Sequence, residues 1–215
     1  ALIMSKLASK ACLVANGVRT PDYCVVESPA APLPDLPFPL VVKPDGQGSS
    51  MGMTRLNKPS GWWRRALVKA FALEDVVFAE VFVAGAEITV GVLDGEPLPV
   101  VEVVPPSGRM FDYDAKYDHR HGHTQYLCPP RHVPADIQER ARQVAVKAFN
   151  ALGAKDMLRV DFIVDAEGEL WALEANSIPG FTGTSLLPMA ARAAGIGFPQ
   201  LVAGLARRNC GRGVL

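Results

Sequence analysis

Two acidic residues and an asparagine occupy matching positions in two neighbouring strand-like runs, residues 157–164 and 169–176. Alternation places Asp161 on the polar face of the first run, and Glu174 and Asn176 on the polar face of the second. A hairpin with a four-residue loop would bring the two polar faces together, with cross-strand Cβ atoms about 5 Å apart. Oxygen ligands without thiol or imidazole favour a hard cation such as Mg²⁺.

The opposite face of this hairpin is expected to enter the core. Its expected members are the apolar residues Leu158, Val160, Phe162 and Val164 of the first run and Trp171, Leu173 and Ala175 of the second. The spacing alone leaves an alternative open, in which the polar face is a solvated strand surface and Arg159 pairs with the acids.

A glycine-rich segment, DGQGSSMG at residues 45–52, lies between the strand-like runs 39–43 and 53–56. It matches neither the P-loop nor the G-x-G-x-x-G dinucleotide motif. Glycines still allow backbone N–H groups to converge on an anion, the serines add hydroxyl donors, and Lys43 adds a positive charge. A flexible hairpin with a polar tip is the alternative that the loop alone leaves open.

Helices and strands are predicted in blocks along the rest of the chain. Apolar spacing predicts helices at residues 4–16, 60–73, 135–152 and from 185 onward, and strands at 23–26, 76–83, 87–93 and 98–104. The last three strands are expected to form an antiparallel meander. Because strict βαβ alternation is missing, we predict an α+β fold with largely antiparallel sheets.

The composition excludes several classes of protein. With 215 residues, 49% of them hydrophobic and 20% charged, the chain is neither disordered nor fibrous. The 22 basic and 22 acidic side chains give no net field to attract nucleic acid or an anionic membrane. No apolar run is long enough to predict a membrane span, and the four cysteines show no metal or disulfide spacing. We expect a cytoplasmic protein with reduced thiols.

Four segments, in order, closely resemble the D-alanine–D-alanine ligases of the ATP-grasp superfamily. They are LVVKPDGQGSSMGM, VFVAGAEITVGVL, DYDAKYDHRHGHTQYLCP and RVDFIVDAEGELWALEANSIPGFTGTSLLPMAA. The resemblance implies an ATP-grasp fold in which two α+β subdomains, residues 1–84 and 85–215, enclose the nucleotide. It implies formation of D-alanyl-D-alanine for peptidoglycan precursors, in which ATP phosphorylates one carboxylate and the second amine attacks the acyl phosphate.

The resemblance also implies the ligands and partners. ATP is the co-substrate, D-alanine the substrate, and two Mg²⁺ ions, with Mn²⁺ as a substitute, are the cofactors. Relatives are commonly dimers, so a homodimer is expected. ATP binding is assigned to seven residues: Lys6 and Lys43 at the phosphates, Glu80, Phe82 and Val83 at the adenine, Glu87 at the ribose and Lys116 at the terminal phosphate.

Metal and substrate roles follow from the same resemblance. Asp161, Glu174 and Asn176 match the ligands of the two Mg²⁺ ions, with Glu174 bridging them. Arg159 and the backbone N–H of Gly180 resemble the donors that stabilise a tetrahedral oxyanion.

Two further pairs complete the implied site. Ser49 and Tyr117 match residues that meet when two loops close over the active site and exclude water. Ser185 and Leu186 resemble the helix start that binds the carboxylate of the second substrate.

The chain departs from the family pattern in three respects, one of which is Ser5, where the family usually has Asp. Family members carry a further N-terminal domain that helps to bind the amine of the first D-alanine, so we expect this sequence to be a fragment. The segment between Tyr117 and Thr124 is longer than usual and contains three histidines. The alternatives are therefore a related ligase that accepts D-serine or D-lactate, or a catalytically silent module that binds Mg-ATP; retention of Tyr117 favours D-alanine.

Overall fold

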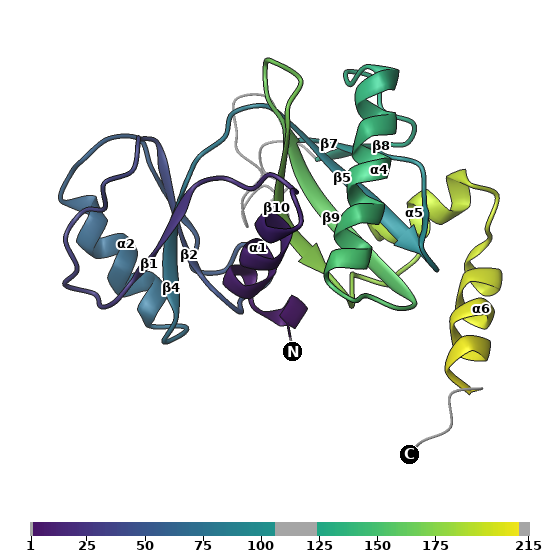
Figure 1. Ribbon diagram of the computed structural model, residues 1–215, viewed down its shortest axis with the longest axis horizontal. Helices are drawn as coiled ribbons and strands as arrows, with labels where there is room; N and C mark the ends of the chain where they lie inside the picture. Colours follow the sequence, from purple (N-terminus) through teal and green to yellow (C-terminus); the bar gives the residue numbers. More distant parts are fainter. Residues whose placement is uncertain (1, 106–123, 211–215) are drawn as a thin grey trace.

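The computed structural model describes residues 2–105 and 124–210 and contains two antiparallel sheets flanked by helices (Figure 1). The first sheet has the order β1-β4-β2-β3, formed by β1 (Tyr23–Val26), β2 (Leu40–Pro44), β3 (Thr54–Leu56) and β4 (Val77–Val81). The second has the order β10-β9-β5-β7-β8, formed by β5 (Ala86–Leu93), β7 (Val101–Val104), β8 (Gln125–Leu127), β9 (Met157–Val164) and β10 (Leu170–Asn176), with β6 (Glu96–Pro97) paired to β5.

The helices lie between and outside these strands in the sequence. They are the 3₁₀ turn η1 (Leu2–Met4), α1 (Lys6–Ala15), α2 (Trp62–Phe71), α4 (Ala135–Ala151), α5 (Leu186–Ala193) and α6 (Phe198–Cys210). Helix α1 begins at an N-cap, since the hydroxyl oxygen of Ser5 accepts a hydrogen bond from the Ala8 N–H at 3.0 Å. The predicted α+β class with antiparallel sheets is therefore confirmed.

The predicted three-strand meander is wrong in its first member. Strand β4 pairs with β1 and β2 in the first sheet, whereas β5 pairs with β7 and β9 in the second. The connection at Ala84 and Gly85 carries the chain from one sheet to the other. A Cβ atom on Gly85 would lie 2.0 Å from the carbonyl oxygen of Val164, so only glycine fits this close approach. The division into domains at residue 84 stays a prediction.

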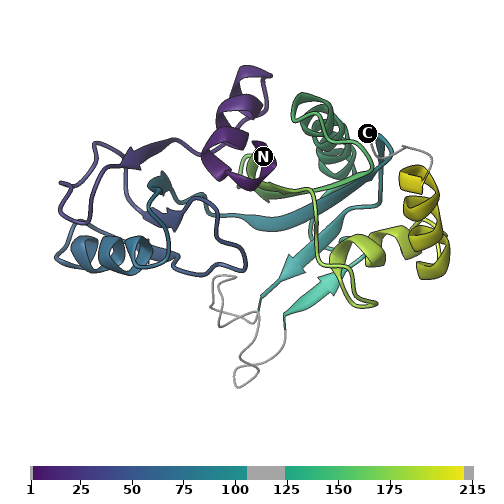
Figure 2. The same cartoon turned by 90° about the horizontal axis from the view of Figure 1, so that it is seen from below.

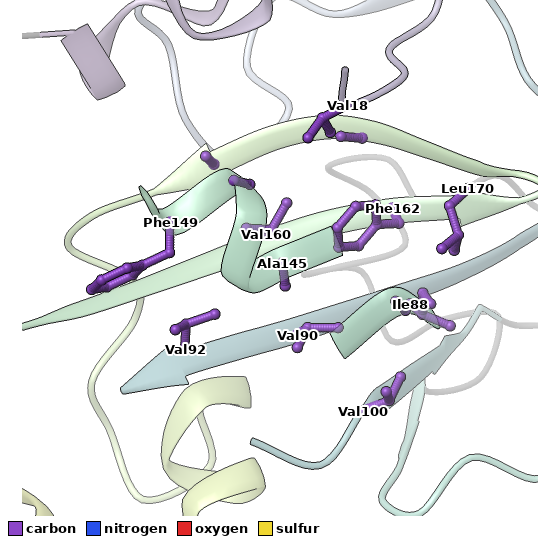
Figure 3. Close-up of a cluster of buried hydrophobic side chains, with 14 of the residues drawn as sticks. Val18, Ile88, Val90, Val92, Val100, Ala145, Phe149, Val160, Phe162 and Leu170 are labelled. Atoms are coloured by element: carbon purple, nitrogen blue, oxygen red, sulfur yellow. The ribbon is translucent and has the colours of Figure 1, made fainter. Parts of the chain in front are cut away.

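Helices cover both faces of the second sheet (Figure 2). On one face, α4 and α1 pack over a core that includes Val90, Val160 and Phe162, shown in Figure 3. On the other face, α5 and α6 cover a smaller cluster around Leu98 and Leu187. Because these layers bury alternate residues of β5 and β9, the hairpin backbone beside the candidate site is held on both sides.

One face of the first sheet is apolar, and the opposite face carries charged side chains beside the buried apolar residues Val41 and Phe78. Helix α2 packs on the apolar face, where Val42, Val77 and Ala79 enter a common cluster with Leu67. The alternate residues of β2 and β4, Lys43 and Glu80 among them, therefore point to the opposite face. This opposite face turns toward α1, where Lys10 pairs with Glu80.

No single helix in the described part of the chain is long and apolar enough to cross a membrane. Helices α5 and α6 have the length and apolar composition of a membrane span only when they are taken together, and the chain bends by 106° between them.

Candidate active site

The hairpin β9–β10 brings the predicted acidic residues together, but not by the predicted loop. Leu170 pairs with Val164, so the loop spans residues 165–169 and is one residue longer than predicted. A register shift between Ala172 and Glu174 then moves Glu174 opposite Asp161. An extra residue in one strand is a β-bulge, a feature that re-aims side chains near functional sites.

Because of the same bulge, the residues that β10 buries differ from those predicted. The buried residues of this strand are Leu170, Ala172 and Ala175, rather than the strictly alternating set that includes Trp171 and Leu173. The indole N–H of Trp171 instead donates to the Asp165 carboxylate at 2.7 Å. The prediction failed because side chains alternate between the two faces of a sheet only while the pairing of the strands is regular, and the bulge interrupts that pairing.

Asp161 is held by donors on three sides. Arg159 binds both of its carboxylate oxygens at 2.8 Å, and the Thr89 hydroxyl donates to Oδ1 at 2.6 Å. Asn176 contacts the same carboxylate at 3.3 Å and that of Glu174 at 3.4 Å. The side chains of Arg159 and Asp161 are only 17% and 12% exposed, so the face is not the solvated surface of the alternative, although its arginine pairing is present.

The charge of Arg159 is stabilised by this arrangement. Burial alone would lower the pKa of the guanidinium, but the adjacent Asp161 carboxylate outweighs that effect and raises the pKa above its ordinary value. Glu174 and Glu87 add smaller contributions in the same direction. A permanent cation therefore lies beside the acidic residues.

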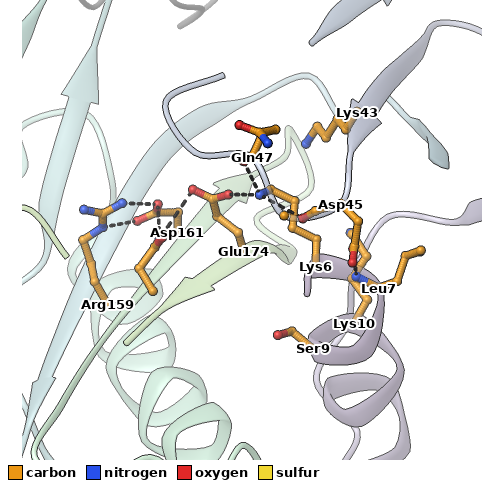
Figure 4. Close-up of polar contacts among 12 residues, drawn as sticks. Lys6, Leu7, Ser9, Lys10, Lys43, Asp45, Gln47, Arg159, Asp161 and Glu174 are labelled. Carbon is orange, nitrogen blue, oxygen red and sulfur yellow. Dashed lines mark hydrogen bonds and ion pairs between the residues drawn. The ribbon is translucent and has the colours of Figure 1, made fainter. Parts of the chain in front are cut away.

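Lys6, the first residue of α1, connects the hairpin to the glycine-rich loop (Figure 4). Its ammonium donates to the carbonyl oxygen of Gln47 at 2.6 Å and lies 3.5 Å from the Glu174 carboxylate. The next residue, Leu7, donates its N–H to the Asp45 carboxylate at 2.7 Å. Segments that are far apart in the sequence thus meet at the start of one helix.

The glycine-rich loop is anchored at its first half. The Gly46 N–H donates to the Glu74 carboxylate at 2.9 Å, and the Gln47 amide lies 3.4 Å from the same oxygen. Ser49 and Ser50 have left-handed backbone, with φ of 53° and 58°, which is uncommon outside glycine. The loop is therefore shaped by a contact with the segment after α2 and by two unusual serine conformations.

Lys43 projects from β2 into a buried cluster of three charges. The Glu80 carboxylate pairs with Lys43 through one oxygen and with Lys10 through the other, at 2.8 Å. Burial alone would raise the pKa of Glu80, but the two ammonium groups outweigh it and lower that pKa. Burial would likewise lower the pKa of Lys43, and Glu80 reverses the direction. We call Lys10, Glu80 and Lys43 the lysine triad.

Sequence reasoning missed Lys10, Thr89 and Glu74. A usable signal existed for the first of these, because Lys6 and Lys10 are four residues apart and so share one face of a helix. Thr89 and Glu74 carry no comparable spacing signal, since their partners are distant in the sequence.

The predicted nucleotide residues of the connection lie beside the first sheet. Phe82 donates its N–H to the carbonyl oxygen of Pro39 at 2.8 Å, and the Arg55 guanidinium lies 3.7 Å from the centre of its ring. Val83 is half-buried, and Glu87 lies on β5 opposite Val103. All three border the junction of the two sheets.

The segment before α5 brings Gly180 and Ser185 together. The Ser185 hydroxyl accepts from the Thr182 N–H at 3.0 Å and lies 2.8 Å from the Thr182 hydroxyl. A Cβ atom on Gly180 would lie 3.0 Å from the Ser185 hydroxyl oxygen. Leu186 is the first residue of the helix. The predicted Lys116 and Tyr117, and the histidines that follow them, lie outside the described residues.

Within residues 2–105 and 124–210, no three His, Cys, Asp or Glu side chains form a metal-binding group. The candidate cation site therefore rests on the two carboxylates of Asp161 and Glu174 and the amide of Asn176. Two carboxylates with a neutral oxygen ligand fit Mg²⁺, which keeps water and phosphate oxygens in its shell.

A glycine-rich loop and lysines on one antiparallel sheet, facing an acidic hairpin on another, are the features of an ATP-grasp fold. The structure is similar to the crystal structure of D-alanine–D-alanine ligase from Bacillus anthracis, with a TM-score of 0.82 and 32% identity over 96% of this chain and 67% of that one. A second structure of that ligase, complexed with ATP, gives a TM-score of 0.79 at 27% identity and covers 99% of this chain and 69% of that one.

Sequence comparison gives the same family. Residues 17–207 match the family model described as D-ala D-ala ligase C-terminus. The chain is 43% identical over 204 residues to the D-alanine–D-alanine ligase of Syntrophotalea carbinolica and 40% identical over 208 residues to that of Gloeobacter violaceus. These matches cover 94% of this chain in each case, and 64% and 68% of the two relatives. The chain belongs to the D-alanine–D-alanine ligase family.

Proposed function

We propose that this chain forms the nucleotide- and metal-binding part of an ATP-dependent ligase that joins two D-alanine molecules. The observation that carries the proposal is the position of Lys6. Its ammonium contacts both the glycine-rich loop at Gln47 and the hairpin carboxylate Glu174. A cation between these two segments is suited to the phosphates of a nucleotide whose metal ions are held by the hairpin.

Asp161, Glu174 and Asn176 would hold two Mg²⁺ ions, or Mn²⁺ in their place. When bound, these ions would neutralise charge on the transferring phosphoryl group. Lys6 and Lys43 bind phosphate oxygens, and their side chains are already held by Gln47 and Glu80.

The nucleotide base and sugar lie along the connection between the sheets. Glu80, Phe82 and Val83 border the adenine, and Glu87 accepts hydrogen bonds from the ribose hydroxyls. The support for this assignment is that Glu80 on β4 and Glu87 on β5 lie on either side of the connection that contains Phe82 and Val83, and that the charge of Glu87 helps to raise the pKa of Lys43. Lys116 completes the set at the terminal phosphate.

The acceptor half of the reaction uses the residues around α5. Arg159 and the Gly180 N–H stabilise the oxyanion formed when the amine attacks the acyl phosphate. Ser185 and Leu186 bind the carboxylate of the second D-alanine at the start of the helix. Ser49 and Tyr117 close over the intermediate, which keeps water from hydrolysing it. In this proposal the enzyme is a cytoplasmic homodimer that supplies peptidoglycan precursors.

A second candidate function is ligation of D-alanine to another acceptor. The crystal structure of VanG D-Ala:D-Ser ligase from Enterococcus faecalis matches this chain with a TM-score of 0.80 and 26% identity over 95% of it and 61% of that chain. The long segment after Tyr117 also favours a difference in the acceptor region. D-lactate is the other acceptor to be compared.

The test is ADP release by the 215-residue chain with Mg-ATP and D-alanine, D-serine and D-lactate in competition, with products identified by mass spectrometry. D-alanyl-D-alanine supports the proposal, and a mixed product supports the second candidate. Binding of Mg-ATP without any turnover would mean either that this nucleotide- and metal-binding part has been separated from the part that binds the first amine, or that the chain is a silent nucleotide-binding module; the two differ in whether a ligase that contains both parts depends on Glu174. Absence of Mg-ATP binding contradicts all three functions.

A further inference from the structure

Lys10 is a buried charged residue to which the proposed reaction gives no direct role. It lies on α1, one turn after Lys6, and is only 2% exposed. Its ammonium lies 2.8 Å from the second oxygen of Glu80 and 5.6 Å from the centre of the Tyr23 ring. Within the described residues it ranks among the largest side chains that are fully buried.

Burial of a charged lysine costs free energy that an apolar side chain of similar volume would not cost. Burial disfavours the ammonium and lowers the pKa of Lys10, and Glu80 offsets only part of that effect. Replacing buried ion pairs by apolar side chains of similar volume is often neutral or stabilising. The stability of the fold therefore does not explain why a charge is kept here.

The charge balance of the lysine triad offers an explanation. Glu80 is also 2% exposed, and each of its two oxygens has a different lysine as partner. Two ammonium groups share one carboxylate, so the triad carries a net charge of one positive unit. Without Lys10, the carboxylate would match Lys43 one to one and leave a neutral pair.

We propose that Lys10 is a positioning residue for the polyphosphate of the nucleotide, acting through Glu80 on Lys43. By occupying one oxygen of Glu80, Lys10 leaves Lys43 only partly neutralised and therefore able to attract a phosphate. This inference rests on the proposed binding of Mg-ATP and extends it to a residue that does not touch the nucleotide. It assigns the charge selectivity of the site to the balance of the triad rather than to Lys43 alone.

The experiment compares the binding of Mg-ATP and of adenosine by calorimetry in four forms of the full chain. These are the unmodified chain, Lys10→Met, the double variant Lys10→Met/Glu80→Gln, and Lys155→Met. Lys155 is an exposed lysine between α4 and β9, so this control removes a charge of the same type away from the triad. Adenosine carries no phosphate and reports any general damage to the nucleotide site.

We expect Lys10→Met to raise the Kd for Mg-ATP about tenfold, as for loss of one charge a few ångströms from an anion in a partly screened site. The Kd for adenosine should change less than about twofold, as should both constants in Lys155→Met. The double variant again has one net positive charge and no unpaired buried carboxylate. It should therefore recover most of the preference for Mg-ATP over adenosine, a ratio that the loss of a Glu80 contact with the adenine would leave unchanged.

Three results would overturn the inference. Equal weakening of Mg-ATP and adenosine in Lys10→Met would mean a structural role, and unchanged Mg-ATP binding would mean no role. A double variant that is folded by circular dichroism but whose preference for Mg-ATP over adenosine is still tenfold lower would exclude the charge balance, even where the single variant does not fold. Failure of the unmodified chain to bind Mg-ATP would instead remove the proposed function itself, and this inference with it.

Discussion

The lysine triad and the acidic hairpin are two charged clusters in which carboxylates and cations are arranged in opposite ways. In the triad, a single carboxylate lies between two lysines and is almost completely buried. In the hairpin, Asp161 and Glu174 lie side by side, and their cations, Arg159 and Lys6, approach from the edges. The lysine triad has an excess of positive charge, whereas the hairpin carboxylates are proposed to bind further positive charge as metal ions.

This difference matches the two ends of the proposed ligand. A nucleotide with divalent ions presents phosphate oxygens to one surface and metal ions to another. The first sheet supplies the cationic surface and the second supplies the carboxylates. Helix α1 carries a lysine to each cluster, Lys10 to the triad and Lys6 to the hairpin. Two sheets with separate cores thus share one charged site.

The largest effect is expected from the hairpin. Glu174→Gln keeps the shape of the side chain but removes the charge proposed to bridge two cations. We expect kcat for dipeptide formation to fall roughly 10³-fold, the upper range for loss of one preorganised charge. Mg-ATP binding should weaken much less, because the lysine triad is untouched. Steady-state kinetics and calorimetry measure the two quantities.

Glu169→Gln is the matched control for that substitution. Glu169 lies in the loop of the same hairpin and pairs with Arg19 at 2.9 Å, away from Asp161. Its replacement should change kcat less than about twofold, as expected for an exposed ion pair. Equal losses in Glu169→Gln and Glu174→Gln would contradict a separate role for the bridging position.

The next effect concerns the connection that holds the two clusters together. Gly85→Ala places a Cβ atom 2.0 Å from the carbonyl oxygen of Val164, so the backbone must shift where the sheets meet. We expect a loss of about 3 kcal/mol in the free energy of unfolding, within the range for severe overpacking. Urea denaturation measures it.

Gly61→Ala is the control for the general effect of replacing a glycine. Nothing lies within 4 Å of a Cβ atom at Gly61, and its φ of −61° suits alanine. This variant should be neutral or stabilised by up to about 1 kcal/mol. A Gly85→Ala protein as stable as Gly61→Ala would show that the junction tolerates a side chain.

The smallest effect is the acid response of the triad. The pKa of Glu80 is lowered in the folded protein because two lysines outweigh its burial. Glu80 therefore stabilises the fold at pH above its ordinary value of 4.5, and this contribution is lost as the pH falls through the lowered value. The double variant Lys10→Met/Glu80→Gln should lack that acid loss, which is worth a Tm difference of about 2–4 °C.

Thermal melts between pH 7 and pH 3 test this expectation. Glu167→Gln, at the exposed tip of the hairpin, serves as the control and should keep the acid response of the unmodified chain. A double variant whose Tm falls with acid as steeply as that of the unmodified chain would mean that Glu80 is not held ionised by the lysines.

Much of the local structure followed from residue patterns. Apolar spacing predicted the helices that became α1 and α4. The clustering of Asp161 with Glu174 on one face of the hairpin was also predicted, but with the wrong loop. A four-residue loop and a five-residue loop followed by a bulge both bring the two polar faces together, and alternation cannot distinguish them.

Partners separated by long stretches of chain could not be predicted in the same way. Thr89 binds Asp161 from a neighbouring strand, and Glu74 binds the glycine-rich loop from the end of a helix. Nothing in the local sequence of either residue identifies its partner. The burial of Lys10 was equally hidden, because its neighbours on α1 do not show that the first sheet covers it.

The sequence by itself determined most helices and strands and the family, and it predicted residues for binding phosphate and metal, because these inferences depend on local periodicity and short motifs. Tertiary structure decided which charges meet. Strand β4 belongs to the first sheet and not to the predicted meander, and this position places Glu80 between Lys10 and Lys43. The reason is physical: electrostatic balance depends on distance and burial in space, and both are set only when the two sheets pack against α1.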